Sequence, residues 1–173
     1  MQDINEFAKK DTQSITSDWL PNIELIDGVE IREVKNVAKE TGYLVEMFRG
    51  DWGFYNNKID QVFQVALFPG TKSGWHVHQI TTDRLFVNYG LVKIVLFDAR
   101  TDSKTYGKIN ELRFGTIRPA MVIVPPGVWH AVENLYDGTS LLINIVDYAY
   151  NYENPDHFRL PIDTDLIPYK FKL

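Results

Sequence analysis

From Ile23 onward, apolar residues occur in short runs rich in Val, Ile, Phe and Tyr, and Gly, Pro, Asn or Asp separates each run from the next. Runs of this length, bounded by turn-forming residues, are typical of β-strands. No long amphipathic helical window lies between them. The pattern predicts an all-β domain that packs as a sandwich or small barrel. The strands are expected at Val29–Val34, Tyr43–Phe48, Val62–Leu67, Leu85–Tyr89, Leu91–Asp98, Met121–Val124 and Leu141–Val146.

The N-terminus differs from this pattern. Asp3 and Glu6 have the spacing of a helix capping box. Ile4, Phe7 and Ala8 fall on one helical face. These residues predict a short N-terminal helix ahead of the strands.

Composition limits the number of domains and the kinds of partner. With 173 residues, 45% of them hydrophobic, the chain can form one core. We expect one domain over residues 1–173, with a core at about 29–147 and an irregular, packed tail at 148–173. The formal net charge of −5 has the wrong sign for nucleic-acid binding through phosphate contacts.

The absence of cysteine excludes disulfides, thiolate metal sites and cysteine nucleophiles. The first residues are polar and mixed in charge, and no apolar run approaches the length of a membrane span. The sequence therefore predicts a cytoplasmic protein with no membrane partner.

Three of the four histidines lie in two short motifs, GWHVH and PPGVWHAVEN. Residues two apart on a strand point to the same face, so His76 and His78 are expected to face one cavity. A proline-containing turn leads into a second predicted strand, which carries His130. The three side chains offer either three ligands for a metal ion or a general base with polar supports. The fourth histidine, His157, is expected in a surface loop.

At these motifs the sequence resembles the cupin superfamily. The first cupin motif is His-x-His, an acid and a glycine, and the second is Pro-x-Gly-x-x-His-x-x-x-Asn. The matching residues are His76, His78, Asp83 and Gly90 for the first motif, and Pro125, Gly127, His130 and Asn134 for the second. The resemblance implies a double-sheet jelly-roll barrel.

From about Gly42 to the C-terminus the sequence also resembles the dTDP-4-dehydrorhamnose 3,5-epimerase family. The strings that carry this resemblance are GYLVEMF, GWHVH, GLVKIVLFDARTDSKTYGKINEL, VPPGVWHAVENL and DYAYNYENPD. The resemblance implies a homodimer that epimerises a 4-keto-6-deoxyhexose carried on a nucleoside diphosphate, as in dTDP-rhamnose biosynthesis. It also implies that no metal or other cofactor takes part.

The same resemblance implies catalytic roles. His76 matches the family's base, Tyr150 its proton donor and His130 the second histidine of its cavity. Epimerisation needs a base that removes a proton beside a ketone and an acid that returns one to the opposite face. Asp163 or Asp165 would have to orient the base. The residues expected to bind substrate are Lys72, Trp75, His78, Arg84 and Asn134.

The sequence departs from the family at residues that would stabilise the enolate or bind the phosphates. His78 stands where the family has Gln, and Asp83 where it has an enolate-stabilising Lys. The family's phosphate-binding arginines are missing or moved, which leaves Lys72, Arg49 and Arg84 as the nearest substitutes.

Two alternative functions therefore stay open. One is a metal-dependent cupin, an oxygenase or isomerase with one divalent ion. Its ligands would be His76, His78, Asp83 and His130. The other is a sugar-binding module without turnover, which would fit the loss of the family's lysine.

Overall fold

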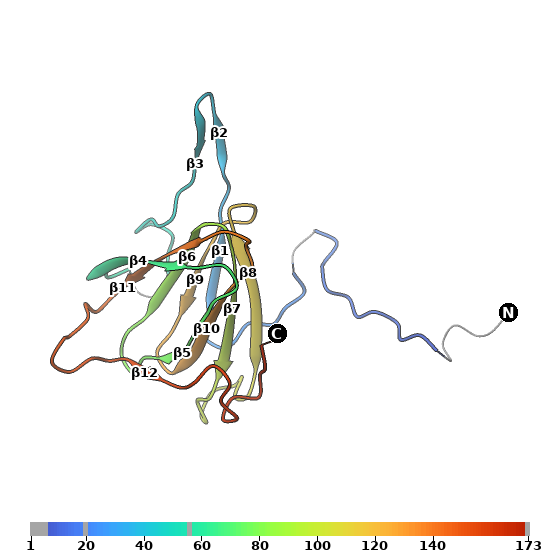
Figure 1. The fold of residues 1–173 in the computed structure, drawn as a ribbon, viewed down its shortest axis with the longest axis vertical. Coiled ribbons are helices and arrows are strands. Elements are labelled where there is room, and N and C mark those ends of the chain that lie inside the picture. The colour runs from blue at the N-terminus through green and yellow to red at the C-terminus, as the bar shows by residue number, and fades with distance from the viewer. Residues whose placement is uncertain (1–6, 19–20, 55–56, 172–173) are drawn as a thin grey trace.

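The computed structural model describes residues 7–18, 21–54 and 57–171. Over these residues the fold is all-β, as the sequence predicts, and contains no helix (Figure 1). The strands are β1 (Glu30–Glu33), β2 (Val37–Lys39), β3 (Gly42–Leu44), β4 (Gln61–Leu67), β5 (Lys72–Val77), β6 (Asp83–Tyr89), β7 (Leu91–Asp98), β8 (Ile109–Gly115), β9 (Ala120–Val124), β10 (Val128–Asn134), β11 (Ser140–Val146) and β12 (Phe158–Arg159).

Two antiparallel sheets of five strands face each other. One has the order β1-β9-β6-β11-β4 and the other the order β12-β5-β10-β7-β8. The hairpin of β2 and β3 projects away from this sandwich (Figure 1). The arrangement is the cupin-like double sheet that the histidine motifs imply.

Alternation along the strands explains where the core ends and a cavity begins. Leu85 and Val87 of β6 and Leu142 of β11 belong to the apolar cluster between the sheets. Asp83 and Asn144 occupy the next same-face positions on these two strands. Apolar side chains therefore close one end of the sandwich, and polar side chains line the other.

Two irregular segments cover the outer faces of the sheets. Residues 45–54 pack on the sheet that contains β6 and β9. Residues 160–171 pack on the other sheet, against Trp75, Val95 and Ala131. The predicted strand Tyr43–Phe48 is thus wrong after Leu44, because the residues that follow cover a sheet instead of joining one.

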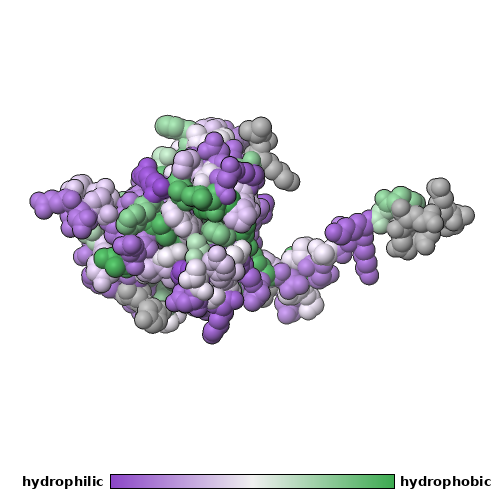
Figure 2. All heavy atoms as spheres, turned by 90° about the horizontal axis from the view of Figure 1, so that it is seen from below, coloured by the Kyte–Doolittle hydropathy of each residue, from purple (hydrophilic) through white to green (hydrophobic). Residues whose placement is uncertain are grey.

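The predicted N-terminal helix is not seen. Asp3, Ile4 and Glu6 lie outside the described residues, while Phe7 lies in a turn and Ala8 has no regular structure. Phe7 is 71% exposed, so no apolar surface stabilises a helix that is too short to persist alone. The described part of this segment extends away from the body of the protein (Figure 2). No helix in the described ranges is long and apolar enough to span a membrane.

Candidate active site

A cavity of about 690 Å³ opens between the two sheets at their polar end. Inward-facing residues of β4, β5, β6, β10 and β11 line it, together with part of the segment 148–159. Of the residues singled out in the sequence, the cavity brings together His76, His78, Asp83, His130 and Tyr150.

The two histidine motifs meet across neighbouring strands. His76 of β5 lies directly opposite His130 of β10, and their ring centroids are 5.7 Å apart. Gly74 permits this close pairing, because a Cβ at that position would lie 2.5 Å from the Cβ of Ala131. The register shifts between His130 and Val132, where β5 contains an extra residue.

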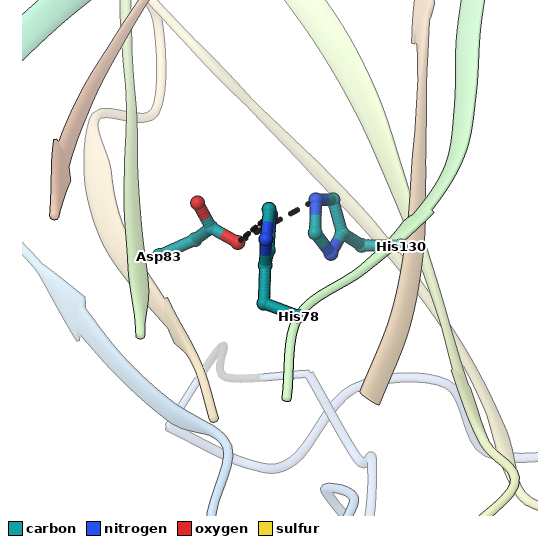
Figure 3. A group of neighbouring side chains, drawn as sticks. All are labelled: His78, Asp83 and His130. Carbon is teal, nitrogen blue, oxygen red and sulfur yellow. Dashed lines mark ion pairs between the residues drawn. The ribbon is translucent and has the colours of Figure 1, made fainter. Parts of the chain in front are cut away.

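His78, Asp83 and His130 form a compact cluster (Figure 3). Asp83 Oδ2 lies 3.3 Å from Nε2 of His78 and 3.6 Å from Nε2 of His130. Asn144 Nδ2 donates a 2.6 Å hydrogen bond to the other carboxylate oxygen of Asp83. One oxygen of the acid is therefore fixed by an amide, and the other faces two imidazole rings.

Asp156 holds His78 in one orientation. The backbone carbonyl oxygen of Asp156 contacts Nδ1 of His78. A carbonyl oxygen can only accept, so Nδ1 of His78 carries the proton and Nε2 faces Asp83. The Asp156 carboxylate accepts hydrogen bonds from the backbone N–H groups of Gln79, Ile80 and Thr81 at 2.7 to 3.0 Å. Burial would raise the pKa of Asp156, but these bonds hold it below its usual value.

His157 lies in the site, not in a remote surface loop, which corrects the sequence-based expectation. Its ring centroid is 4.8 Å from that of His76 and 5.1 Å from that of His78. Its Nε2 atom is buried and has no hydrogen-bond partner among the described residues. All four histidines of the chain therefore surround one space.

The surroundings of His76 keep it neutral. Burial lowers its pKa from 6.5 to about 3, and the charges of His130, His157 and Arg159 act in the same direction. Burial likewise lowers the pKa of His130. At neutral pH, His76 therefore presents an unprotonated ring nitrogen to the cavity.

Two residues expected to bind substrate point away from the cavity. Arg84 follows Asp83 on β6 and so faces the opposite side of the sheet, where it is buried. Its Nη1 donates to the carbonyl oxygen of Ile145 at 3.3 Å. Trp75 precedes His76 on β5 and is fully buried. Its ring packs on Tyr169 and Phe171 of the C-terminal tail, on the outer face of the sheet.

Lys72 and Asn134 also lie outside the cavity lining. Lys72 is paired with Glu133 at 3.4 Å on the neighbouring strand. Asn134 is buried and donates from Nδ2 to the carbonyl oxygens of Leu67, Phe68 and Gly138. Asn134 thus ties a turn to β4, a structural task that explains its place in the motif.

The tail acids do not reach the base. Asp163 and Asp165 are exposed, and Asp165 pairs with Lys170 at 2.6 Å. Neither lines the cavity, so neither orients His76 in this structure.

Tyr150 lines the cavity, as does Tyr148, two residues earlier in the chain. Its side chain is 46% exposed, and its ring packs against Tyr152 with centroids 5.2 Å apart. The backbone N–H of Tyr150 donates to Gln61 Oε1 at 2.9 Å, which fixes this segment to β4.

Asn144, Asp156 and Arg159 are site residues that the sequence reading missed. Asn144 occupies an inward position of a correctly expected strand, so strand alternation could have found it. Asp156 and Arg159 belong to the irregular tail. The strand β12 has only two residues, too few for an alternating pattern that would predict a strand.

Known proteins share both the sequence and this fold. Residues 24–166 match the family model of dTDP-4-dehydrorhamnose 3,5-epimerase. The chain is 34% identical to the "probable low-salt glycan biosynthesis epimerase" of Haloferax volcanii, over 83% of this chain and 91% of that protein.

Two solved structures illustrate the shared fold. The dTDP sugar isomerase of Desulfovibrio desulfuricans superposes with a TM-score of 0.78 at 23% identity, covering 84% of this chain and 91% of the other. A 3'-monoepimerase of Streptomyces bikiniensis, solved with dTDP-quinovose, superposes with a TM-score of 0.71 at 23% identity, covering 82% and 74%. With most of its length matched by the family model, this chain belongs to the dTDP-4-dehydrorhamnose 3,5-epimerase family and is a sugar-nucleotide epimerase.

Proposed function

We propose that this protein epimerises a 4-keto-6-deoxyhexose carried on a nucleoside diphosphate, with His76 as the base. His76 takes a proton from a carbon beside the ketone, and the electron pair of that C–H bond forms an enolate. Tyr150 then returns a proton to the opposite face of the same carbon, and His130 contacts the sugar between them. The observation that supports this proposal is the neutral His76 ring in the cavity.

His76 faces the cavity uncharged and can accept a proton, although the burial that keeps it neutral also lowers its basicity. A positioned base contributes roughly 10²- to 10⁴-fold to such a reaction. Because burial keeps the ring uncharged, its lone pair is available throughout the neutral pH range. The enolate oxygen needs a hydrogen-bond donor or a positive charge. With Asp83 at the position of the family's lysine, the neighbouring imidazole group of His130 is the donor we propose.

Solvent deuterium exchange tests the proposal directly. Wild-type protein in D₂O should incorporate deuterium at the carbons beside the ketone of a dTDP-linked 4-keto-6-deoxyhexose. His76→Asn should abolish exchange, whereas Arg113→Gln, on the exposed surface, should not change it. Absence of exchange in the wild type with several nucleotide-linked 4-keto sugars would contradict the assignment.

We also propose that the protein is a homodimer. The hairpin of β2 and β3 projects from the sandwich with Val37, Tyr43 and Leu44 about half exposed. A second copy that covers this hairpin would remove its apolar side chains from water. Light scattering should give twice the chain mass of 20.0 kDa, and a monomer at micromolar concentration would contradict the proposal.

A second candidate function uses a metal ion, and the cluster of His78, Asp83 and His130 favours it. Ligand atoms of a tetrahedral zinc site lie about 3.4 Å from one another. The Nε2-to-carboxylate distances of 3.3 and 3.6 Å fit this spacing. His76 is not a member of the cluster, so the four-ligand set expected from the sequence is reduced to three. A bound ion would act as a Lewis acid toward a carbonyl oxygen.

The variant His78→Gln separates the two candidates. In the metal-free reaction this change restores the residue that the family has, so activity should be retained. In the metal-dependent reaction it removes a ligand and should lower metal affinity about 10-fold or more. Elemental analysis of purified wild-type protein gives the independent check: well under one metal per chain, unchanged after reloading, argues against the metal site.

A further inference from the structure

The cavity has few groups that could bind the diphosphate of the proposed substrate. None of the three cations expected from the sequence, Lys72, Arg49 and Arg84, lines it. Lys72 and Arg49 are paired with acids, and Arg84 is buried on the opposite face of β6. A diphosphate carries negative charge that requires a cation or several N–H donors. The cation must therefore come from elsewhere in the chain.

Arg159 is the one Lys or Arg among the described residues that line this cavity. It lies on β12, the strand that the C-terminal segment adds to the edge of the sheet next to β5. Arg159 is the register partner of His76, and directly opposed residues of antiparallel strands point to the same face. A row across the sheet therefore contains Arg159, His76 and His130 in that order.

The Arg159 side chain stands at the rim and is free to bind a ligand. It is exposed, and among the described residues no carboxylate lies within ion-pair distance of its guanidinium. It also borders a second, more open hollow on the outer side of β5, lined by Trp129, Pro126 and Phe158. Arg159 thus lines both the inner cavity, which contains the base, and the hollow at the protein surface.

We propose that Arg159 binds the diphosphate of the nucleotide sugar at the rim of the cavity that contains His76. This inference rests on the proposed epimerase reaction. A guanidinium presents paired N–H donors that match two phosphate oxygens, and it stays charged at every physiological pH. Arg159 would thereby replace, from the C-terminal segment, the family's arginines that this chain lacks near GWHVH.

Calorimetric titration with dTDP and with inorganic pyrophosphate tests the inference without requiring turnover. Arg159→Gln should weaken dTDP binding about 10- to 100-fold, the range expected for loss of a charged hydrogen bond. Arg159→Lys should fall between the wild type and Arg159→Gln, because it keeps the charge but loses the paired donors. Arg113→Gln, which changes an arginine paired with Glu111 on the exposed surface of β8, should bind like the wild type. β12 is a short exposed edge strand, so these variants should unfold at the wild-type temperature.

Kinetics give a second readout. Arg159→Gln should raise KM for the dTDP-linked 4-keto sugar, while deuterium exchange at saturating substrate should stay close to the wild-type rate. Wild-type affinity for dTDP in Arg159→Gln, or no binding of either probe by the wild type, would overturn the inference. Binding that depends on Arg159 without any exchange would instead contradict the epimerase reaction and leave the diphosphate site standing.

Discussion

Asn144 Nδ2 donates a 2.6 Å hydrogen bond to Asp83 Oδ1, and both side chains are buried. The amide oxygen of Asn144 accepts from the backbone N–H of Arg84 at 3.1 Å. The amide thus fixes both the carboxylate and the strand that carries it. As a result, the second oxygen of Asp83 is directed toward His78 and His130.

Removing this amide should destabilise the protein and disorder the cluster. Asn144→Ala leaves a buried carboxylate oxygen and a buried N–H without partners, which should cost about 1–3 kcal/mol of unfolding free energy. Gln64→Ala, exposed on the adjacent β4, is the matched control and should have little effect. Urea unfolding of the two variants measures the difference, and equal midpoints would show that the amide does not hold Asp83.

Asp156 should be needed to shape the segment after β5. Its carboxylate accepts hydrogen bonds from three consecutive backbone N–H groups. It also accepts one from Thr81 Oγ1 at 2.8 Å. Asp156→Ala should cost about 1–3 kcal/mol, because it leaves these donors unpaired. Asp165→Ala, in the same tail but exposed, should change stability by less than about 0.5 kcal/mol.

Asp156→Ala should also loosen residues 79–81, the segment that directly follows His78. Hydrogen exchange at residues 79–81 should accelerate in Asp156→Ala and stay unchanged in Asp165→Ala. Protected amides at these positions in Asp156→Ala would mean that other contacts hold the segment.

Tyr150 should control inversion and not proton removal. Tyr150→Phe should keep deuterium exchange at the first carbon, because His76 is intact, but should lose most epimerised product, because no acid reaches the opposite face. Tyr148 lines the same cavity, but Lys58 Nζ lies 4.2 Å from the centre of the Tyr148 ring. Tyr148→Phe is therefore the matched control and should retain inversion. Product stereochemistry by NMR measures both, and loss of inversion in Tyr148→Phe alone would transfer the acid role to Tyr148.

Short apolar runs and strand alternation predict the parts of this fold that depend only on residues close together in the sequence. β6, β7 and β11 are runs of apolar and β-branched residues, and the structure has them at nearly the expected bounds. Strand alternation also places His76 and His78 in one cavity and turns Arg84 away from Asp83. These relationships follow from a repeat of two residues and need no tertiary information.

The remaining site residues depend on where a distant segment returns to the barrel. His157 and Arg159 reach the cavity because β12 pairs with β5, about 80 positions earlier in the chain. Their local sequence is rich in proline and polar residues, which is typical of a loop. No local pattern specifies that pairing, so the sequence predicts the two histidine motifs and Tyr150 but misses His157 and Arg159.

Asp98 should give the fold part of its resistance to acid. Its buried carboxylate accepts hydrogen bonds from the side chains of Arg100, Ser103 and Thr105 at 2.6 to 3.0 Å. Burial alone would raise the pKa of Asp98, but these bonds hold it well below the ordinary value of 3.8. The folded state therefore releases this proton more readily than the unfolded chain, so the network stabilises the protein above pH 3.8 and loses its effect as the pH falls further.

Asp98→Asn should consequently be less stable than the wild type at pH 7, and the difference should shrink as the pH falls below 3.8. Thermal unfolding between pH 7 and pH 2.5 measures it, with Asp11→Asn, exposed on the extended N-terminal segment, as the matched control. The Asp11 variant should follow the wild type at every pH. A stability difference for Asp98→Asn that does not change with pH would mean that the aspartate contributes through packing and not through its charge.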